Sequence, residues 1–406
     1  MTSQPLLTAT TLRRASLDAV LGFAWDAEAF TASDVIESVG LTRSTAIDVI
    51  GELVERGLLA ELPNARAAGD YRKGRPARRF AFRSDAGCVI GVDAGRAHLT
   101  ATVADLRGEA HTVRRLEVGP DEDSPDGRRR DAARVVDEAL AAAGMGRSAV
   151  AALCVGVPAP VDRDGASPPH RDDFWRRMNP DFAGLFGAWA PLVRVENDAS
   201  LAAVAERAVG AAVGYDDFVT LLAGERLGAG VWVDGRPLRG AHGGAAEMVA
   251  FDHVAGVEGA WGLGYRAADL ARRALADGSV TATSGLRKLP DDRIDGKTVL
   301  ALAAEGDDAA LAVARQVGET LAVVAGVLGS FFDSRRIIVS GAVAAGAAPV
   351  IEAARAALPR ELDLPVPEIV ASTLGADIVS LGAVRAAVES ARERALDLPA
   401  FAVAAA

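Results

Sequence analysis

The sequence predicts a small α+β domain at the N-terminus, followed by a larger α/β domain. The first 83 of its 406 residues hold three amphipathic helical patterns and then two short strands, whereas strands and helices alternate from Cys88 onward. A chain of this length is too long for one ordinary domain. Half of the residues are hydrophobic and only 5% are aromatic, which favours an α/β core packed from small aliphatic side chains.

Composition also excludes several classes of protein. No run of about 18 apolar residues free of charges occurs, so we expect no membrane span. The first residues lack a basic segment followed by an apolar one and do not form a secretory signal. Cys88 and Cys154 each stand in an apolar, strand-like run, which indicates buried thiols rather than a disulfide. We therefore expect a cytoplasmic protein.

Two helices are predicted before residue 40. The first covers about residues 13–25 and has one apolar face. The second opens at Thr31, where Asp34 completes a capping-box-like start, and it ends before Gly40. A glycine just after a helix accepts the left-handed backbone that ends it, so Gly40 predicts a tight turn into the next helix.

The third helix is predicted over about 43–56, with Thr42 as its N-cap. Four apolar residues at positions i, i+3, i+4 and i+7 should form its buried stripe: Ala46, Val49, Ile50 and Leu53. The opposite face near its N-terminus carries Arg43, Ser44, Ile47 and Asp48. A helix, a glycine turn and a second helix place such residues at base edges in the DNA major groove. A three-helix bundle without a DNA role fits the same pattern.

Two short strands, 58–62 and 78–82, flank a Gly- and Arg-rich hairpin and predict a wing, hence a winged helix-turn-helix domain. Its tip carries Arg72, Lys73 and Arg75, and the Gly-Arg-Pro context suits entry of Arg75 into a narrow minor groove. The net charge of −11, averaged over the whole chain, argues against nucleic-acid binding. The charge is unevenly distributed, however, because residues 66–83 hold seven basic residues and one acidic residue. A solvated linker is the alternative explanation of this strip.

The larger domain contains an ordered set of glycine-rich segments after apolar strands. The segments are Asp93-Ala-Gly95, Glu196-Asn197-Asp198, Gly224 to Gly230, Gly240 to Glu247 and Gly341 after an apolar strand. In this order the chain resembles the ROK family of repressors, open reading frames and sugar kinases. The resemblance implies an actin-like, ribonuclease-H-like ATPase fold of two α/β lobes with a sugar cleft between them, and a homodimer or dimer of dimers.

The resemblance also implies domain boundaries and site residues. We expect the DNA-binding domain over 1–83, the first lobe over 84–198, the second lobe over 199–395 with a C-terminal helix returning to the first lobe, and a flexible tail over 396–406. Asn197, Asp198 and Glu247 match the sugar-holding residues of the family. Asp198 could instead cap the helix 199–209, a purely structural role.

Two phosphate loops depart from the kinase pattern. The first reads Asp-Ala-Gly and then Arg96 and Ala97, where the kinases have Gly-Thr; the second carries Glu225 and Arg226 in place of Thr and Gly. Phosphoryl transfer depends on positioning and electrostatics, so these changes predict no ATP binding, no cofactor and no catalytic residue. Arg226 could partly neutralise Glu225.

The family zinc motif is lost as well. Ala250 takes the place of the His ligand, and the stretch 256–265 contains no cysteine, so His253 and Glu258 cannot complete a tetrahedral site. Tyr265 stands where the family has a further sugar-binding Glu, which predicts an altered ligand pocket. The run 128–130, three arginines, is predicted to form the solvated face of a helix.

These observations lead to three functional hypotheses. The first is a regulator, a repressor, that binds double-stranded DNA at a pseudo-palindromic operator and responds to a carbohydrate in the cleft. The second is an active ATP-dependent sugar kinase with an appended DNA-binding domain. The third is a constitutive DNA-binding protein whose larger domain serves only for dimerisation.

Overall fold

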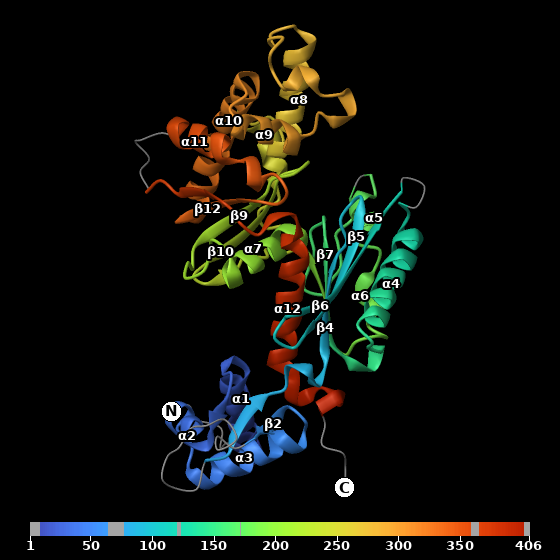
Figure 1. The fold of residues 1–406 in the computed structure, drawn as a ribbon, viewed down its shortest axis with the longest axis vertical. Coiled ribbons are helices and arrows are strands. Elements are labelled where there is room, and N and C mark those ends of the chain that lie inside the picture. The colour runs from blue at the N-terminus through green and yellow to red at the C-terminus, as the bar shows by residue number, and fades with distance from the viewer. Residues whose placement is uncertain (1–8, 64–76, 120–122, 171, 359–364, 402–406) are drawn as a thin grey trace.

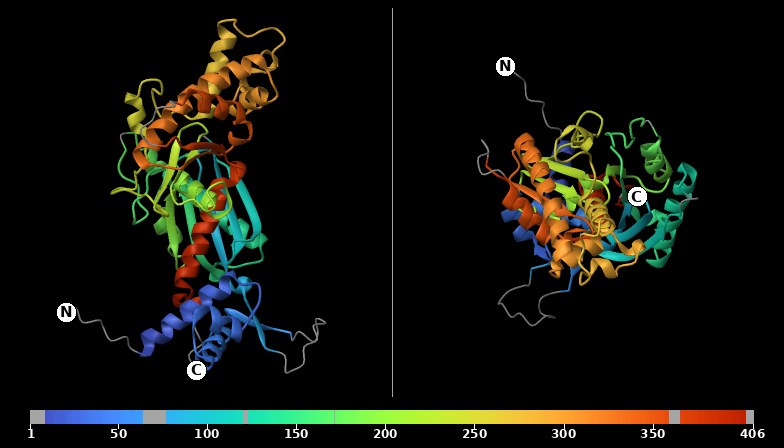
Figure 2. Two further views of the ribbon diagram at one scale, coloured as in Figure 1. Left: turned by 90° about the vertical axis from the view of Figure 1, so that its left-hand side faces the viewer. Right: turned by 90° about the horizontal axis from the view of Figure 1, so that it is seen from above.

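The computed structural model describes residues 9–63, 77–119, 123–170, 172–358 and 365–401, arranged as three parts along one long axis (Figure 1). The N-terminal part lies at one end, a first five-stranded sheet lies in the middle, and a second five-stranded sheet with its helices lies at the other end. Figure 2 shows helix α12, in red, running from the second sheet down to the N-terminal part.

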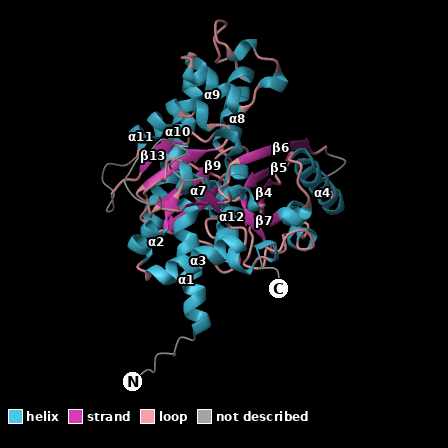
Figure 3. Cartoon of the chain, turned by 60° about the horizontal axis from the view of Figure 1, so that its bottom comes forward, coloured by secondary structure: helices cyan, strands magenta, loops and turns pink. Residues whose placement is uncertain are grey.

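The N-terminal part packs three helices against a three-stranded antiparallel sheet of order β1-β3-β2, and Figure 3 brings these helices forward. Its elements are α1 (Ala9–Asp26), β1 (Phe30–Thr31), α2 (Ala32–Val39), α3 (Arg43–Glu55), β2 (Leu59–Leu62) and β3 (Arg79–Phe82). The predicted helices and strands are confirmed, although α1 begins four residues earlier than expected. The capping box at Thr31, the Thr42 N-cap and the left-handed Gly40 are all present.

The stripe predicted for α3 is buried, with each of its four side chains no more than 2% exposed. It packs against α1, α2 and β2. Burying a side chain of this kind stabilises the fold by about 1.5–3 kcal/mol for Val, Leu or Ile. Packing of this stripe therefore fixes which face of α3 is left for solvent or for a partner.

The first sheet has the order β6-β5-β4-β7-β8, with β4, β7 and β8 parallel and the β4-β5-β6 meander antiparallel. Its strands are β4 (Cys88–Asp93), β5 (His98–Asp105), β6 (Ala110–Glu117), β7 (Val150–Val157) and β8 (Val193–Asn197). Helices α4 (Pro125–Ala142) and α12 (Ile378–Arg394) pack on it, and α5 (Phe174–Met178) and α6 (Phe182–Phe186) pack against α4. Both cysteines are buried and free, as predicted.

The second sheet has the order β11-β10-β9-β12-β13. Its strands are β9 (Phe218–Leu222), β10 (Gly228–Val233), β11 (Arg236–Pro237), β12 (Arg336–Ser340) and β13 (Glu368–Ala371). Helix α7 (Asp198–Val209) packs on β9, β10 and α12, and so joins the two sheets. The outer helices are α8 (Leu263–Ala276), α9 (Gly296–Ala304), α10 (Asp308–Phe332) and α11 (Ala348–Ala357).

One of these helices, α10, is long and apolar enough by composition to cross a membrane. It contains Arg315 and Glu319, and it packs against α8, α9 and α11. Half of its most apolar window is buried inside the protein. These contacts are those of a core helix.

The C-terminal residues correct the prediction of a flexible tail. Residues 396–401 are ordered as two short 3₁₀ turns, Ala395–Asp397 and Pro399–Phe401, and Leu396, Leu398 and Phe401 are buried. The aromatic ring of Phe401 lies against Gly87, where an added Cβ would be 3.3 Å from it. Residues 402–406 lie outside the described residues. One apolar core therefore runs from α1 to α3 through α12 into the first sheet, so the N-terminal part is packed directly on the larger domain.

Candidate functional site

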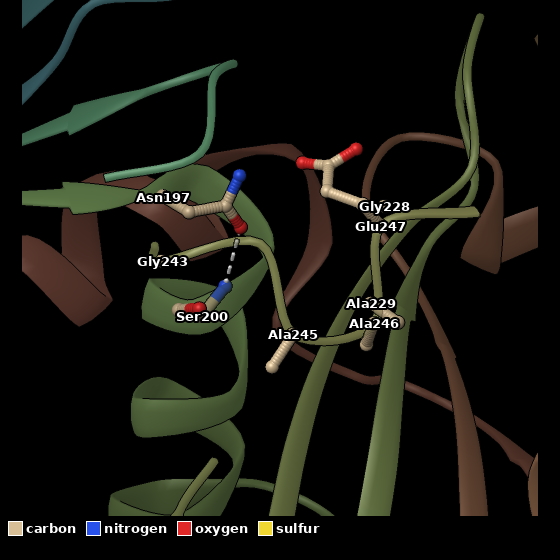
Figure 4. A pocket seen from close by; sticks show the side chains of 8 residues that line it. All are labelled: Asn197, Ser200, Gly228, Ala229, Gly243, Ala245, Ala246 and Glu247. Atoms are coloured by element: carbon tan, nitrogen blue, oxygen red, sulfur yellow. Dashed lines mark hydrogen bonds between the residues drawn. The ribbon is translucent and has the colours of Figure 1, made fainter. Parts of the chain in front are cut away.

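A pocket lies where α7 meets the loop 240–247, close to the ends of β8 and β10 (Figure 4). Asn197 and Glu247 are its principal polar side chains, and glycine and alanine form most of its remaining wall. Its volume of about 10 Å³ is close to the space of one water molecule. Two of the three predicted sugar contacts therefore lie at one pocket, which has room for a sugar only if the loop or the lobes move apart.

Asn197, rather than Asp198, caps α7. The Asn197 Oδ1 accepts a hydrogen bond from the Ser200 N–H at 3.1 Å, and its Nδ2 donates to the Ala159 carbonyl at 3.2 Å. The predicted capping role of Asp198 is wrong because the N-cap is the last residue with extended backbone, and that residue is Asn197. The Asp198 carboxylate is thus left free of the cap, with Oδ1 accepting from the Ala199 N–H at 2.7 Å.

The Asp198 carboxyl lies in an unusual electrostatic environment. Its pKa is raised to about 7, first because burial disfavours the charged form and further because the carboxylates of Asp93 and Glu247 lie nearby. Glu247 lies at the same pocket, and loss of water around its carboxyl raises its pKa, while the positive charges of Arg226 and His170 oppose that shift. Three carboxyls from different segments therefore lie near one another, which suits the recognition of several hydroxyl groups.

Two contacts that the sequence did not reveal hold the pocket loop. The Arg239 guanidinium, at the start of the loop, donates to the buried Glu196 carboxylate at 2.6 Å, and Arg194 binds the same carboxylate. Gly243 has φ of 72°, and an added Cβ would lie 1.9 Å from the Val161 carbonyl oxygen. Only glycine fits there, because the loop touches the first lobe.

The exposed face of α3 forms a second candidate site. Arg43, Ser44, Ile47 and Asp48 are all exposed, and Ile47 is 48% exposed although it is a large apolar residue. The predicted wing strands pair from Leu59↔Phe82 to Leu62↔Arg79. Arg72, Lys73 and Arg75 lie outside the described residues. Within the rest of the basic strip, Arg78 forms an ion pair with Glu61, and Arg83 with Asp85.

The sequence profile described as the ROK family matches residues 89–389. The chain belongs to the ROK family. A curated relative, the xylose repressor of Bacillus subtilis (strain 168), is 22% identical over 214 residues, which are 52% of this chain and 53% of that protein. The xylose repressor of Caldicellulosiruptor bescii is 21% identical over 59% of each chain. The chain spans about half the length of the curated relatives it matches.

Solved structures support the fold of most of the chain. A structure described as a ROK family transcriptional regulator, a homologue of the E. coli MLC protein, has a TM-score of 0.71 at 20% identity and covers 94% of this chain and 97% of its own. A ROK family glucokinase from Streptomyces griseus, solved with glucose and AMPPNP, has a TM-score of 0.60 at 25% identity and covers 75% of this chain and 100% of its own. The actin-like sugar-kinase fold of the larger domain is thereby established.

The two loops that bind phosphate in ROK kinases do not fit a nucleotide here. Arg96 of the first loop donates to the Glu225 carboxylate of the second at 3.1 Å, so the two loops are paired with each other. Arg226, which could partly neutralise Glu225, places its guanidinium 4.8 Å from the centre of the Trp261 ring. A polyphosphate would meet the carboxylate of Glu225 and would have to displace Arg96.

Arg128 binds the backbone of the first of these loops, and its position corrects a prediction. The run 128–130 was expected to be a solvated face, but the Arg128 side chain is fully buried. Its guanidinium donates to the carbonyls of Ala94 at 2.9 Å, Gly95 at 2.7 Å and Arg96 at 3.3 Å. Asp123 lies 3.5 Å away and provides the counter-charge. Of the three arginines only Arg130 is exposed.

The segment that binds zinc in other ROK proteins does not fit a metal in this chain. Within the residues that the structure describes, no group of three or more His, Cys, Asp and Glu side chains is placed to hold one. Arg266 holds the segment instead, donating to the carbonyls of Val257, Gly259 and Trp261 at 2.5–3.0 Å. Tyr265 stacks on Trp261 at 4.4 Å, so a neutral aromatic pair stands where the family has a carboxylate.

Proposed function

We propose that this protein is a DNA-binding transcriptional regulator, a repressor of carbohydrate genes, with a ROK domain that binds a sugar and does not phosphorylate it. The observation that carries the proposal is an exposed face at the N-terminus of α3, in an N-terminal part that shares an apolar core with the larger domain. The names of the xylose repressors and of the regulator structure support the same function.

DNA recognition would use a winged helix-turn-helix made by α2, α3 and the β2-β3 strands. The α3 face with Arg43, Ser44, Ile47 and Asp48 would enter the major groove of a pseudo-palindromic operator, with a homodimer or dimer of dimers covering both half-sites. Arg72, Lys73 and Arg75 would contact the flanking backbone and minor groove. We infer a cytoplasmic protein that needs neither a cofactor nor a metal.

Sugar recognition would use Asn197, Asp198 and Glu247, and the response would follow from movement of the lobes. The pocket of about 10 Å³ cannot hold a sugar as it stands. A sugar that binds must therefore favour a more open arrangement of the loop 240–247 or of the lobes, and a ligand that prefers one arrangement shifts the population toward it. Because the N-terminal part is packed on α12, such a shift would change the spacing of two operator-binding units.

Selection of genomic DNA fragments with the purified full-length protein tests the proposal directly. We expect enrichment of a pseudo-palindromic site next to carbohydrate genes, and a sugar that changes its affinity. Enrichment that no sugar alters would favour the constitutive DNA-binding protein, and the absence of any enriched site would refute the regulator.

Sugar phosphorylation should be absent. The Arg96–Glu225 pair would set a carboxylate against the ATP phosphates, and kinases depend on the positioning and electrostatics of these loops for almost all of their rate. The measurement is ATP-dependent phosphorylation of glucose, N-acetylglucosamine and mannose in a coupled assay. Turnover of about one per second, the low end for kinases, would establish the alternative of a kinase with an appended DNA-binding domain.

Arg43→Ala should weaken operator binding by about 1–3 kcal/mol and relax one position in each half-site, because a guanidinium at the start of α3 reaches a guanine edge. Fluorescence anisotropy with the selected operator and single-base variants measures both effects. Arg56→Ala is the matched control, since Arg56 stands at the other end of α3 and its guanidinium binds Glu52. Equal losses for the two variants would contradict docking through the α3 N-terminus.

A further inference from the structure

A second, larger cavity lies where α1 of the N-terminal part meets α7, α12 and β10, away from the pocket at Asn197. Its volume is about 630 Å³, within the range of about 300–1,000 Å³ that small-molecule sites occupy. Apolar side chains form much of its wall: Leu21, Val204, Ala208, Trp232 and Val388. The cavity therefore touches the N-terminal part and both lobes, a place where a ligand would contact all three.

Gly22 keeps this cavity open on the α1 side. A glycine in a helix interior lowers the stability of the helix by about 1 kcal/mol relative to alanine. Such a glycine is usually explained by a close neighbour that leaves no room for a side chain, or by a positive φ. Neither applies here, because an added Cβ at Gly22 would meet no atom within 4 Å and its φ is not positive. The missing side chain instead leaves space in the cavity that Gly22 lines.

The charged groups on the wall decide which ligand suits the cavity. Four of the six are already paired with groups beyond it: Asp18 with Arg14, Arg207 with Asp216, Glu389 with Arg194, and Arg392 with Asp26. Glu393 is exposed, so water hydrates its charge.

Arg385, the remaining charged residue of the wall, uses only part of its hydrogen-bonding capacity. Its Nη1 donates to the Arg107 carbonyl at 3.1 Å, while its Nε is buried and has no hydrogen-bond partner among the described residues. A guanidinium that is only partly hydrogen-bonded, on a largely apolar wall, suits a carboxylate or sulfonate attached to a flat apolar body.

We propose that this junction cavity binds a small amphipathic organic acid, such as an aromatic carboxylic acid, and that its occupancy alters how α1 packs on α12. The contact at stake is local, since Arg392 donates both to Asp26 and to the Gly22 carbonyl beside the cavity. A ligand that favours one packing of α1 changes operator affinity, and the operator changes ligand affinity by the same factor. The effect on DNA rests on the proposed function, but the site does not.

The probe for the site is 8-anilinonaphthalene-1-sulfonate, which joins aromatic rings to one anionic group. Added to the full-length protein, it should give a fluorescence increase that saturates at one probe per chain. Gly22→Leu places a bulky side chain in the cavity and should weaken probe binding at least about tenfold without lowering the melting temperature, since leucine favours a helix. Arg385→Gln should weaken binding as well.

Gly326→Leu in α10 is the matched control, because an added Cβ there also meets nothing within 4 Å and Gly326 does not line the cavity. It should bind the probe as the unchanged protein does. Probe affinity that Gly22→Leu leaves unchanged would overturn the site.

The effect on DNA is measured separately as operator affinity with and without saturating probe. A change of at least about threefold in the unchanged protein, absent in Gly22→Leu, supports the regulatory role. Probe binding with constant operator affinity overturns that role and leaves the site standing. If the protein binds no operator at all, the proposed function fails, and the fluorescence titration still decides whether the site exists.

Discussion

Asparagine in place of Asp198 should weaken sugar binding by roughly tenfold or more and yet make the folded protein more stable above neutral pH. The carboxylate is a candidate acceptor for sugar hydroxyls, and hydrogen bonds to a charged group are each worth about 1.5–3 kcal/mol. Its loss should therefore reduce affinity by roughly tenfold or more. Thermal unfolding with a panel of sugars measures this, because a sugar that binds the folded protein raises its melting temperature.

The stability part of this prediction follows from the pKa of Asp198. In the folded protein the pKa is about 7, above its ordinary value of 3.8, so the folded state holds the proton more tightly than the unfolded chain. This carboxyl thus favours folding most below about pH 4, and its contribution is lost as the pH rises through 7. Asparagine does not titrate, so the unchanged protein should lose stability relative to Asp198→Asn between pH 4 and 8.

Two outcomes would contradict this account of Asp198. A sugar-dependent shift in melting temperature that survives in Asp198→Asn would remove the residue from the ligand site. A difference in stability that does not depend on pH would show that the carboxyl titrates normally. Asp162→Asn is a suitable control, because its carboxylate only closes a turn through the amides of Asp164 and Ala166.

Methionine in place of Arg128 should lower the free energy of unfolding by about 3–5 kcal/mol, the usual loss when one partner of a buried ionic network is removed. The substitution leaves the carbonyls of the first phosphate loop without their donor and leaves the carboxylate of Asp123 unpaired. Methionine has a similar volume and fills the space, so the loss reports mainly on the polar contacts. Urea denaturation followed by circular dichroism gives the free energy.

Arg130→Met is the control for this prediction, because Arg130 stands on the same helix but is exposed. Its substitution should change stability by no more than about 0.5 kcal/mol. A loss below about 1 kcal/mol in Arg128→Met would mean that the first loop keeps its shape without the guanidinium, and that its pairing with the second loop is set elsewhere.

Local features of the N-terminal part were readable from the sequence. Thr31 and Asp34 form the capping box, Thr42 caps α3, and Gly40 ends α2, as their spacing predicts. The period of 3.6 residues also located the buried stripe of α3 correctly. These signals are readable because a cap, a turn and a helical face each involve residues within about four positions of one another.

The candidate sugar site was predictable only in part. The family resemblance predicted that Asn197 and Glu247 belong to one site, and both line one pocket. It did not predict which residue caps α7, because that depends on where β8 ends, and Asn197 and Asp198 are both suitable N-cap residues. The tether from Arg239 to Glu196 spans 43 positions and has no local signal. The raised pKa of Asp198 likewise depends on Asp93, which a different strand brings near.

The sequence by itself determined the order of helices and strands, the faces that α3 buries and exposes, and the loss of phosphate-loop and zinc residues. Tertiary structure alone decided that Arg128 is buried, that Arg96 pairs with Glu225, and that Phe401 packs against Gly87. The physical reason is that a charged or apolar residue without local periodicity finds its partner only when distant segments pack together. Arg128 carries the same charge as its exposed neighbour Arg130, and only the carbonyls of a loop 32–34 residues away make its burial favourable.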